Sequence, residues 1–197
     1  MKTIRYHITL LSWKMEALGA FWRDRKGTGA IEFAIIAPLL IMAYISSFEV
    51  SLGFSIARKV SRASSTVADI LTQQSSVDKA TLDGMKDVAK SIMAPYAMTK
   101  YTLKVTGIKM TAAGVGTVAW SRDQDGGTPY KAGSVATVPS DIPAASTFIV
   151  RSELVVPHQL LLFAPNLDKT LSPINLSKTY YFRQRVGTDI KCNDCGS

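Results

Sequence analysis

The chain has 197 residues, of which 47% are hydrophobic and 19% charged, and its 23 lysines and arginines outnumber its 15 aspartates and glutamates. This length predicts one folded domain with an appendage, and a mean hydropathy of +0.12 is high for a soluble protein, so we expect part of the chain to lie in lipid. With only two cysteines and two histidines, a disulfide-rich scaffold and a four-thiolate zinc site are excluded, and the apolar content excludes intrinsic disorder.

Residues 1–27 form a basic leader. They carry six basic and two acidic side chains, which is half of the net charge of +8. Positive charge before an apolar segment predicts a cytoplasmic N-terminus. Because Arg58, Lys59 and Arg62 follow the apolar segment, the predicted orientation also rests on the position of the folded domain, which lies only on the C-terminal side.

The apolar segment runs from Ala30 to Ala57 and contains only two charged residues, Glu32 and Glu49. A helix over the 24 residues 33–56 would span about 36 Å, enough to cross a hydrocarbon core of about 30 Å. The alternatives are the buried core helix of a soluble protein and a cleaved secretory signal, whose apolar core would be shorter. We expect a membrane span, with Glu49 near its outer end reaching toward the headgroups.

The junction between leader and span has a distinctive pattern. Gly27 ends the basic cluster, four small or apolar residues follow, and then come Glu32, Phe33 and an apolar run that contains Pro38. A charged side chain costs about 2.5–3.5 kcal/mol at the centre of a membrane, so an acid at the start of a span is a candidate functional residue.

These residues resemble the TadE/TadG-like pseudopilins of the tight-adherence (Flp-type) pilus system, through the motif Gly27-TGAI-Glu32-Phe33 and its continuation to Pro38. The resemblance implies that a prepilin peptidase cuts between Gly27 and Thr28, and that Glu32, Phe33 and Pro38 serve recognition and assembly. Thr28 and Glu32 are four residues apart, so they share one helix face. The new ammonium group of Thr28 would then pair with Glu32 of the same or a neighbouring subunit, unless Glu32 simply rests in the headgroup layer.

Beyond the span, apolar residues continue at helical spacing, which predicts an amphipathic stem to about Gln74. They are Val60, Ala63, Val67, Ile70 and Leu71. Ser75 and Ser76 predict a break, and a second helix is predicted over 78–93, before Pro95.

Alternating β-branched segments predict strands over 101–110, 115–122, 147–156 and 178–190, with a polar Gly/Pro-rich loop at 123–146. The predicted fold class is α+β and pilin-like: a long N-terminal transmembrane helix extends into a stem, and a small domain with an antiparallel sheet follows. We expect a leader at 1–27, the transmembrane helix and stem at 28–74, and an extracytoplasmic domain at 75–197.

The C-terminus carries a C-x-x-C pair, Cys192 and Cys195. In an oxidising compartment this pair can close a local disulfide, whereas free or intermolecular thiols and a metal or redox role remain the alternatives. We expect no metal site and no cofactor.

The sequence therefore predicts a minor pilin or pseudopilin, processed after Gly27, that assembles a tight-adherence pilus and is not an enzyme. Its expected partners are a prepilin peptidase, other pilins and pseudopilins, the inner-membrane assembly platform and the lipid bilayer, with no nucleic acid. Its expected location is the bacterial inner membrane, single-pass, with a cytoplasmic N-terminus and a periplasmic or extracellular C-terminal domain. The main alternative is an uncleaved, membrane-tethered periplasmic binding or adhesion module.

Overall fold

The computed structural model describes residues 27–140, 142, 146–159 and 173–195, which excludes the leader apart from Gly27. The chain divides into two compact units, Met1–Phe48 and Glu49–Ser197. One helix, α2 (Thr28–Thr72), contributes its first part to one unit and its second part to the other. The predicted long helix with a stem is confirmed, and it ends two residues before the predicted Gln74.

In the first unit, the side chains of α2 are apolar and almost all exposed. Phe33 is 70% exposed, and the large apolar residues from Ile31 to Phe48 are accessible around the whole helix. An 18-residue window of α2 has a mean hydropathy of 1.9 and no buried residue, so the helix is long and apolar enough to cross a membrane. A helix that is apolar all round needs lipid or other helices about it.

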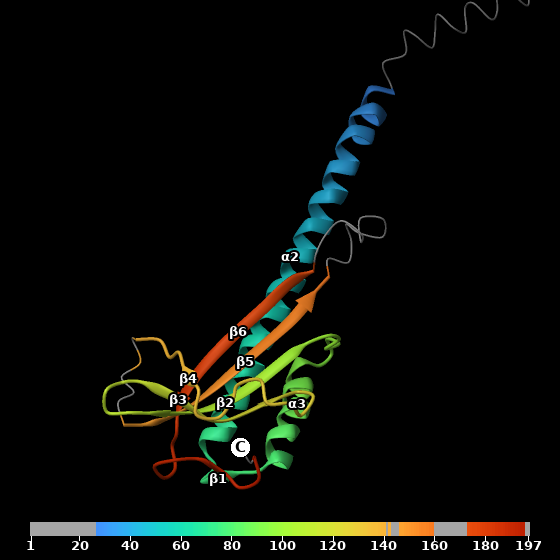
Figure 1. Ribbon diagram of the computed structural model, residues 1–197. Helices are drawn as coiled ribbons and strands as arrows, with labels where there is room; N and C mark the ends of the chain where they lie inside the picture. The colour runs from blue at the N-terminus through green and yellow to red at the C-terminus, as the bar shows by residue number, and fades with distance from the viewer. Residues whose placement is uncertain (1–26, 141, 143–145, 160–172, 196–197) are drawn as a thin grey trace, which may run out of the picture. The chain divides into compact units, whose positions relative to one another are not determined.

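The described residues of the second unit form the rest of α2, helix α3 (Lys79–Met93) and seven strands. The strands are β1 (Ser76–Val77), β2 (Thr102–Met110), β3 (Gly116–Asp123), β4 (Val135–Ala136), β5 (Phe148–His158), β6 (Ile174–Arg183) and β7 (Lys191–Cys192). Five strands form an antiparallel sheet in the order β4-β3-β2-β5-β6, and β1 pairs with β7 in parallel (Figure 1). The predicted α+β class with an antiparallel sheet is confirmed.

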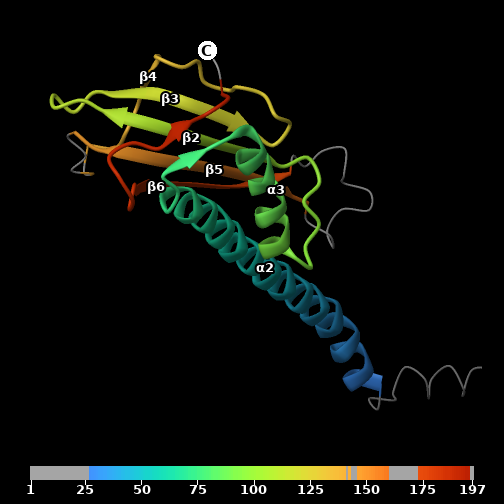
Figure 2. The same cartoon turned by 90° about the horizontal axis from the view of Figure 1, so that it is seen from below.

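The main core of this unit lies between the sheet and the two helices, which cover the same face (Figure 2). The predicted stem positions Val60, Ala63, Val67 and Leu71 are all fully buried there. Helix α3 contributes its own stripe, Leu82, Met85, Ala89 and Met93. The helical periodicity read from the sequence therefore identified the buried face of the stem, although Ile70 of the predicted stripe is only half-buried.

A smaller cluster covers the opposite face of the sheet. Ile108, Met110, Val118 and Ile149 lie there, and Tyr130 from the loop after β3 packs over them. Phe148 and Val150 belong to the main core while Ile149 belongs to this cluster, as the alternation of a strand requires.

A register shift in the β2–β3 pair decides which face Trp120 joins. Gly107 pairs with Trp120, but the next residue, Ile108, pairs with Val118, so Ala119 is skipped. In a regular strand Val118 and Trp120 would face the same side. The extra residue turns Trp120 to the helix-covered face while Val118 stays on the other.

Three strand assignments differ from the sequence prediction. The last long strand, β6, covers Ile174–Arg183 rather than 178–190, and the predicted loop 123–146 contains the short strand β4. Strand β5 continues through Pro157, which the prediction placed after its end. Pro157 lies beyond the pairing of β5 with β2, which ends at Val155, and pairs on the other side with Asn175 of β6.

The prediction that Glu49 reaches the headgroups is wrong. Its side chain is only 5% exposed, and it opens the second compact unit.

Candidate functional site

The junction residues lie at the start of α2. Gly27 is exposed and immediately precedes the helix, whose first residue is Thr28. A Cβ at Gly27 would meet no heavy atom within 4 Å, so the backbone before Thr28 is sterically accessible. Among the described residues, α2 begins directly after the bond between Gly27 and Thr28.

Glu32 lies one helical turn after Thr28, on the same face of α2. It is exposed, as are its apolar neighbours Ile31 and Phe33. Pro38 lies within the same helix, which continues past it without a break. The structure therefore places Gly27, Thr28, Glu32, Phe33 and Pro38 on three turns of one helix start.

The second unit begins with an apolar-to-basic change along α2. Val50 and Phe54 are exposed, and the Arg58 guanidinium lies 4.3 Å from the centre of the Phe54 ring. Lys59 donates from its ammonium to the carbonyl oxygens of Ile92, at 3.2 Å, and Ala94. These carbonyls end α3, where the helix dipole favours a cation, so Lys59 has a structural role that its sequence position did not reveal.

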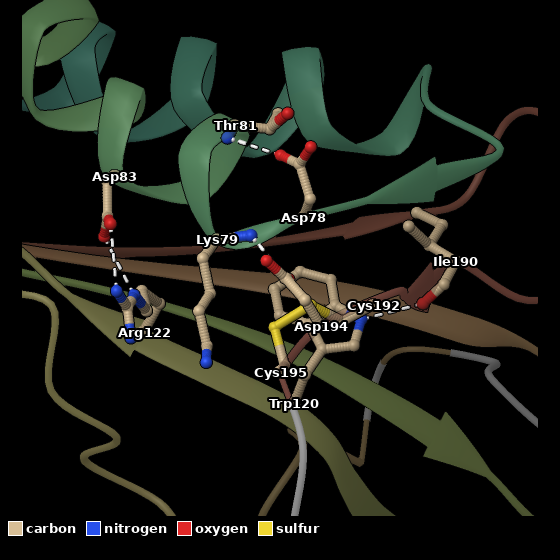
Figure 3. Close-up of a disulfide and its surroundings, with 10 residues drawn as sticks. All are labelled: Asp78, Lys79, Thr81, Asp83, Trp120, Arg122, Ile190, Cys192, Asp194 and Cys195. Atoms are coloured by element: carbon tan, nitrogen blue, oxygen red, sulfur yellow. Dashed lines mark hydrogen bonds and ion pairs between the residues drawn. A yellow bond between two sulfur atoms is a disulfide. The ribbon is translucent and has the colours of Figure 1, made fainter.

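The two cysteines form a disulfide at the C-terminal end of the described chain (Figure 3). Cys192 belongs to β7, which pairs with β1 just before α3. The pairing continues as the Asn193 N–H donates to the Val77 carbonyl at 2.9 Å. The disulfide therefore closes a turn that is already attached to the segment between the two helices.

Asp194, inside the disulfide loop, reaches the start of α3. Its Oδ1 accepts the Lys79 backbone N–H at 2.8 Å, while Asp78 accepts the Thr81 N–H at 2.7 Å (Figure 3). Two N–H groups that a helix start leaves without an intrahelical partner are thereby satisfied. The hydrogen bond from Thr81 also lowers the pKa of Asp78 below its usual value.

Two residues of β3 make further contacts in this region: Trp120 with the C-terminal tail and Arg122 with α3. The Trp120 indole N–H donates to the Ile190 carbonyl at 2.7 Å, and Ile190 itself is fully buried. Arg122 donates to both carboxylate oxygens of Asp83 on α3, at 2.8 and 2.9 Å. This bidentate hydrogen bonding lowers the pKa of Asp83 and raises that of Arg122.

Cys192, Asp194 and Cys195 offer three metal-ligand atoms close together. The two sulfurs are bonded to each other, however, and a thiolate is needed to bind a metal or to attack a disulfide. In this oxidised form the group serves to hold the tail, and the sequence signal for it was the C-x-x-C spacing alone.

Two polar groups of the second unit were not identified from the sequence. Ser64, on the buried face of α2, donates to the Ser152 carbonyl of β5 at 3.1 Å. His158, at the end of β5, is buried, and its position after an alternating strand was the only signal for that. The serine lies among other serines of the helix, so no pattern distinguished it.

Comparison with known proteins gives one match. Residues 27–69 match the family described as TadE-like protein. No curated protein and no solved structure matches the chain.

Proposed function

We propose that the protein is a minor pilin or pseudopilin of a tight-adherence (Flp-type) pilus, because residues 27–69 match the family described as TadE-like protein. The junction motif resembles pseudopilins of the tight-adherence pilus system, and in this proposal the chain is a pilus-related subunit and not an enzyme. The observation that carries the proposal is that the match begins at Gly27 and covers the exposed apolar helix together with the start of the stem.

A prepilin peptidase processes the chain between Gly27 and Thr28. The site lies at the start of α2, and Gly27 has open space around its Cα. Cleavage would remove the basic leader, residues 1–27, and leave the helix start as the new N-terminus.

Glu32 then sets the register between neighbouring subunits. Its carboxylate is exposed in an apolar surrounding, where an unpaired charge is costly. The ammonium that cleavage creates at Thr28 is the natural counter-charge, on the same subunit or on a neighbour. Phe33 and Pro38 lie on the following turns of the same helix, and their side chains are recognised by the peptidase and by other pilin helices.

The protein spans the bacterial inner membrane once, with the leader in the cytoplasm. In this proposal residues 28–74 form the transmembrane helix and stem, and residues 75–197 the domain outside the cytoplasm. Support comes from the basic cluster before the span. Lys59 donates to a carbonyl at the end of α3, so part of the positive charge after the span has a structural role and does not argue against this membrane orientation. Other pilins and the inner-membrane assembly platform are the partners.

Mass spectrometry of the mature N-terminus tests the processing step. We expect a chain that begins at Thr28 in cells with active peptidase, and a chain that keeps the leader when Gly27 is replaced by leucine. Gly53→Leu is the matched control, because a Cβ there also meets no atom within 4 Å and the residue lies far from the junction. Wild-type protein that begins at Met1 in such cells would contradict the proposal and support an uncleaved tether.

A second experiment tests the role of Glu32. Glu32→Gln keeps the size of the side chain but removes its charge, so we expect normal cleavage and loss of co-purification with the other pilins. Ser46→Ala, which removes a hydroxyl that donates to the Met42 carbonyl of its own helix, is the control and should assemble normally. Normal assembly of the Glu32→Gln variant would show that the carboxylate does not set the register.

A further inference from the structure

A pocket of about 500 Å³ lies in the second unit, where α2, the segment after α3 and the end of β5 meet. Its apolar wall includes Leu52 and Ile56 of α2 and Tyr96. Its polar lining includes Lys100 and His158. Small-molecule sites commonly combine such an apolar wall with a few polar groups.

His158 is the unusual member of this lining. It is only 9% exposed, and its Nε2 atom has no hydrogen-bond partner among the residues that the structure describes. The backbone of His158 is fixed by pairing with Ile174 of β6. A buried polar atom without a partner lowers stability, so a retained one calls for a ligand that forms a hydrogen bond with it.

Lys100 adds a positive charge to the same pocket. Its φ angle is +56°, a left-handed conformation that a residue with a side chain seldom adopts. Within the described part of the chain, its ammonium makes no ion pair or hydrogen bond. Backbone strain held in place by the surrounding structure is typical of binding sites. Together the imidazole and the ammonium favour an anionic group.

The pocket lies at the level of α2 where the apolar surface changes to a basic one. Phe54 is 57% exposed, and Arg58 folds back over its ring. Lysines and arginines of membrane proteins extend to the headgroups in this way while their stems cover apolar surface. Leu52 and Ile56, which line the pocket, are one turn or less from Phe54 along the helix. The ligand is therefore expected to be anionic at one end and apolar at the other.

We propose that this pocket binds the headgroup of an anionic phospholipid from the bilayer in which the protein is anchored. The phosphate accepts the Nε2–H of His158 and pairs with the Lys100 ammonium, while the glycerol end of the lipid contacts Leu52 and Ile56. Basic pockets next to membrane helices recognise headgroups through the same chemistry. The proposal rests on membrane anchoring but not on cleavage after Gly27.

Imidazole NMR of the full chain tests the proposal. The protein, with ¹⁵N-labelled histidine, is inserted into nanodiscs of phosphatidylcholine, and phosphatidylglycerol is then exchanged in. We expect the His158 signals, assigned by a His158→Gln variant, to shift with phosphatidylglycerol and to remain unchanged in phosphatidylcholine alone. His7, the other histidine, serves as the internal control. Unchanged His158 signals at a large excess of phosphatidylglycerol would overturn the proposal.

Two further comparisons test whether the bound anion is a lipid headgroup or free phosphate, and whether the charge of Lys100 contributes to binding. Inorganic phosphate added to phosphatidylcholine nanodiscs should leave the His158 signals unchanged, and a full shift with phosphate alone would overturn the lipid assignment.

Lys100→Asn tolerates the left-handed backbone but removes the charge, and we expect about tenfold weaker binding of phosphatidylglycerol. Lys131→Asn, in an exposed loop outside this pocket, is the matched control and should bind as the wild type does. Equal binding by the two variants would contradict the role of Lys100. Failure of the protein to insert into nanodiscs would instead refute the anchoring on which both proposals stand.

Discussion

The hydroxyl of Ser64 on α2 lies within hydrogen-bonding distance of both the carbonyl oxygen and the hydroxyl of Ser152 on β5, at 3.1 and 3.3 Å. The Lys178 carbonyl of β6 lies at 3.3 Å from the same hydroxyl. Both serines are fully buried. One side chain of the stem therefore contacts two adjacent strands, and Ser61 of the same helix also hydrogen-bonds to Tyr180 of β6, so polar contacts fix the position of the helix along the sheet.

Replacing Ser64 by alanine should lower the free energy of unfolding by about 1–2 kcal/mol, because the Ser152 groups lose a buried partner. Urea unfolding of the full chain in detergent micelles measures this, with Trp120 fluorescence as the signal in a Trp13→Phe, Trp22→Phe background. Ser65→Ala is the control, since that exposed hydroxyl donates to the Arg62 carbonyl in its own helix. Equal stability of the two variants would show that the Ser64 contact contributes nothing.

The ion pair of Asp83 and Arg122 should make stability depend on pH. Because the pKa of Asp83 is lowered in the folded state, the pair stabilises the fold above the unfolded value of about 3.9, and this contribution is lost as pH falls through the folded pKa. We expect Asp83→Asn to cost about 1 kcal/mol at pH 7 and nothing once the wild-type carboxyl is protonated.

Asp87→Asn is the matched control for this prediction. Asp87 and Lys90 are exposed and 4.0 Å apart, so removing the charge should change stability by less than about 0.3 kcal/mol at any pH. Unfolding curves collected from pH 7 to pH 3 compare both variants with the wild type. A constant difference between Asp83→Asn and the wild type across this range would mean that the ion pair is not the cause.

Ile190 should be the most important residue of the C-terminal tail. It is fully buried in the main core, so Ile190→Ala should cost about 2–4 kcal/mol. Val186→Ala, at an exposed position a few residues earlier, should cost less than about 0.5 kcal/mol. Urea unfolding measures both, and similar losses for the two variants would contradict the burial of the tail.

The disulfide should contribute less than the packing of Ile190. It closes a loop of only two intervening residues, which limits its entropic effect to at most about 2 kcal/mol. Hydrogen bonds from Trp120, Asn193 and Lys79 hold the same tail. We expect the double variant Cys192→Ser, Cys195→Ser to remain folded in micelles, with native Trp120 fluorescence. Complete unfolding of this variant would show that the covalent bond, rather than these contacts, holds the tail.

Two glycines should respond to alanine in opposite directions. A Cβ at Gly107 would lie 2.7 Å from Phe148 Cζ and closer still to the Trp120 ring, so Gly107→Ala should cost about 1–3 kcal/mol or prevent folding. Gly84, in α3, has no atom within 4 Å of the same position, and Gly84→Ala should stabilise by about 0.5–1 kcal/mol. Thermal unfolding of both variants and of the wild type measures these effects. A less stable Gly84→Ala variant would contradict the open space around Gly84.

The sequence predicted the two helices and the strands β2, β3 and β5 closely, because their signals are local. The helix predicted over 78–93 is α3, which ends at Met93 before Pro95, although its N-cap is Asp78 itself. The parallel pair of β1 and β7 was not predicted, since Val77 and Cys192 are far apart in the chain and each strand has only two residues. The bulge at Ala119 was also missed, because alternation alone gives no sign of a skipped residue.

Of the candidate site, the junction residues were all recognisable, since the motif is contiguous and lies on one helix. Their chemistry beyond the helix start remains a prediction. His158 could not be recognised as a pocket residue, because the pocket is assembled from segments around Leu52, Tyr96 and Pro173 that the sequence leaves far apart.

The position of Ile190 also determines when this protein can finish folding. A nascent chain that has been synthesised as far as β6 already contains every strand of the large sheet but still lacks the residue that fills the core beside Trp120. The partner of β1 (Ser76–Val77) is β7 (Lys191–Cys192), which is synthesised long after it. The core of the domain therefore stays open until Ile190 has left the ribosome, and a chain that ends before Ile190 could not close it.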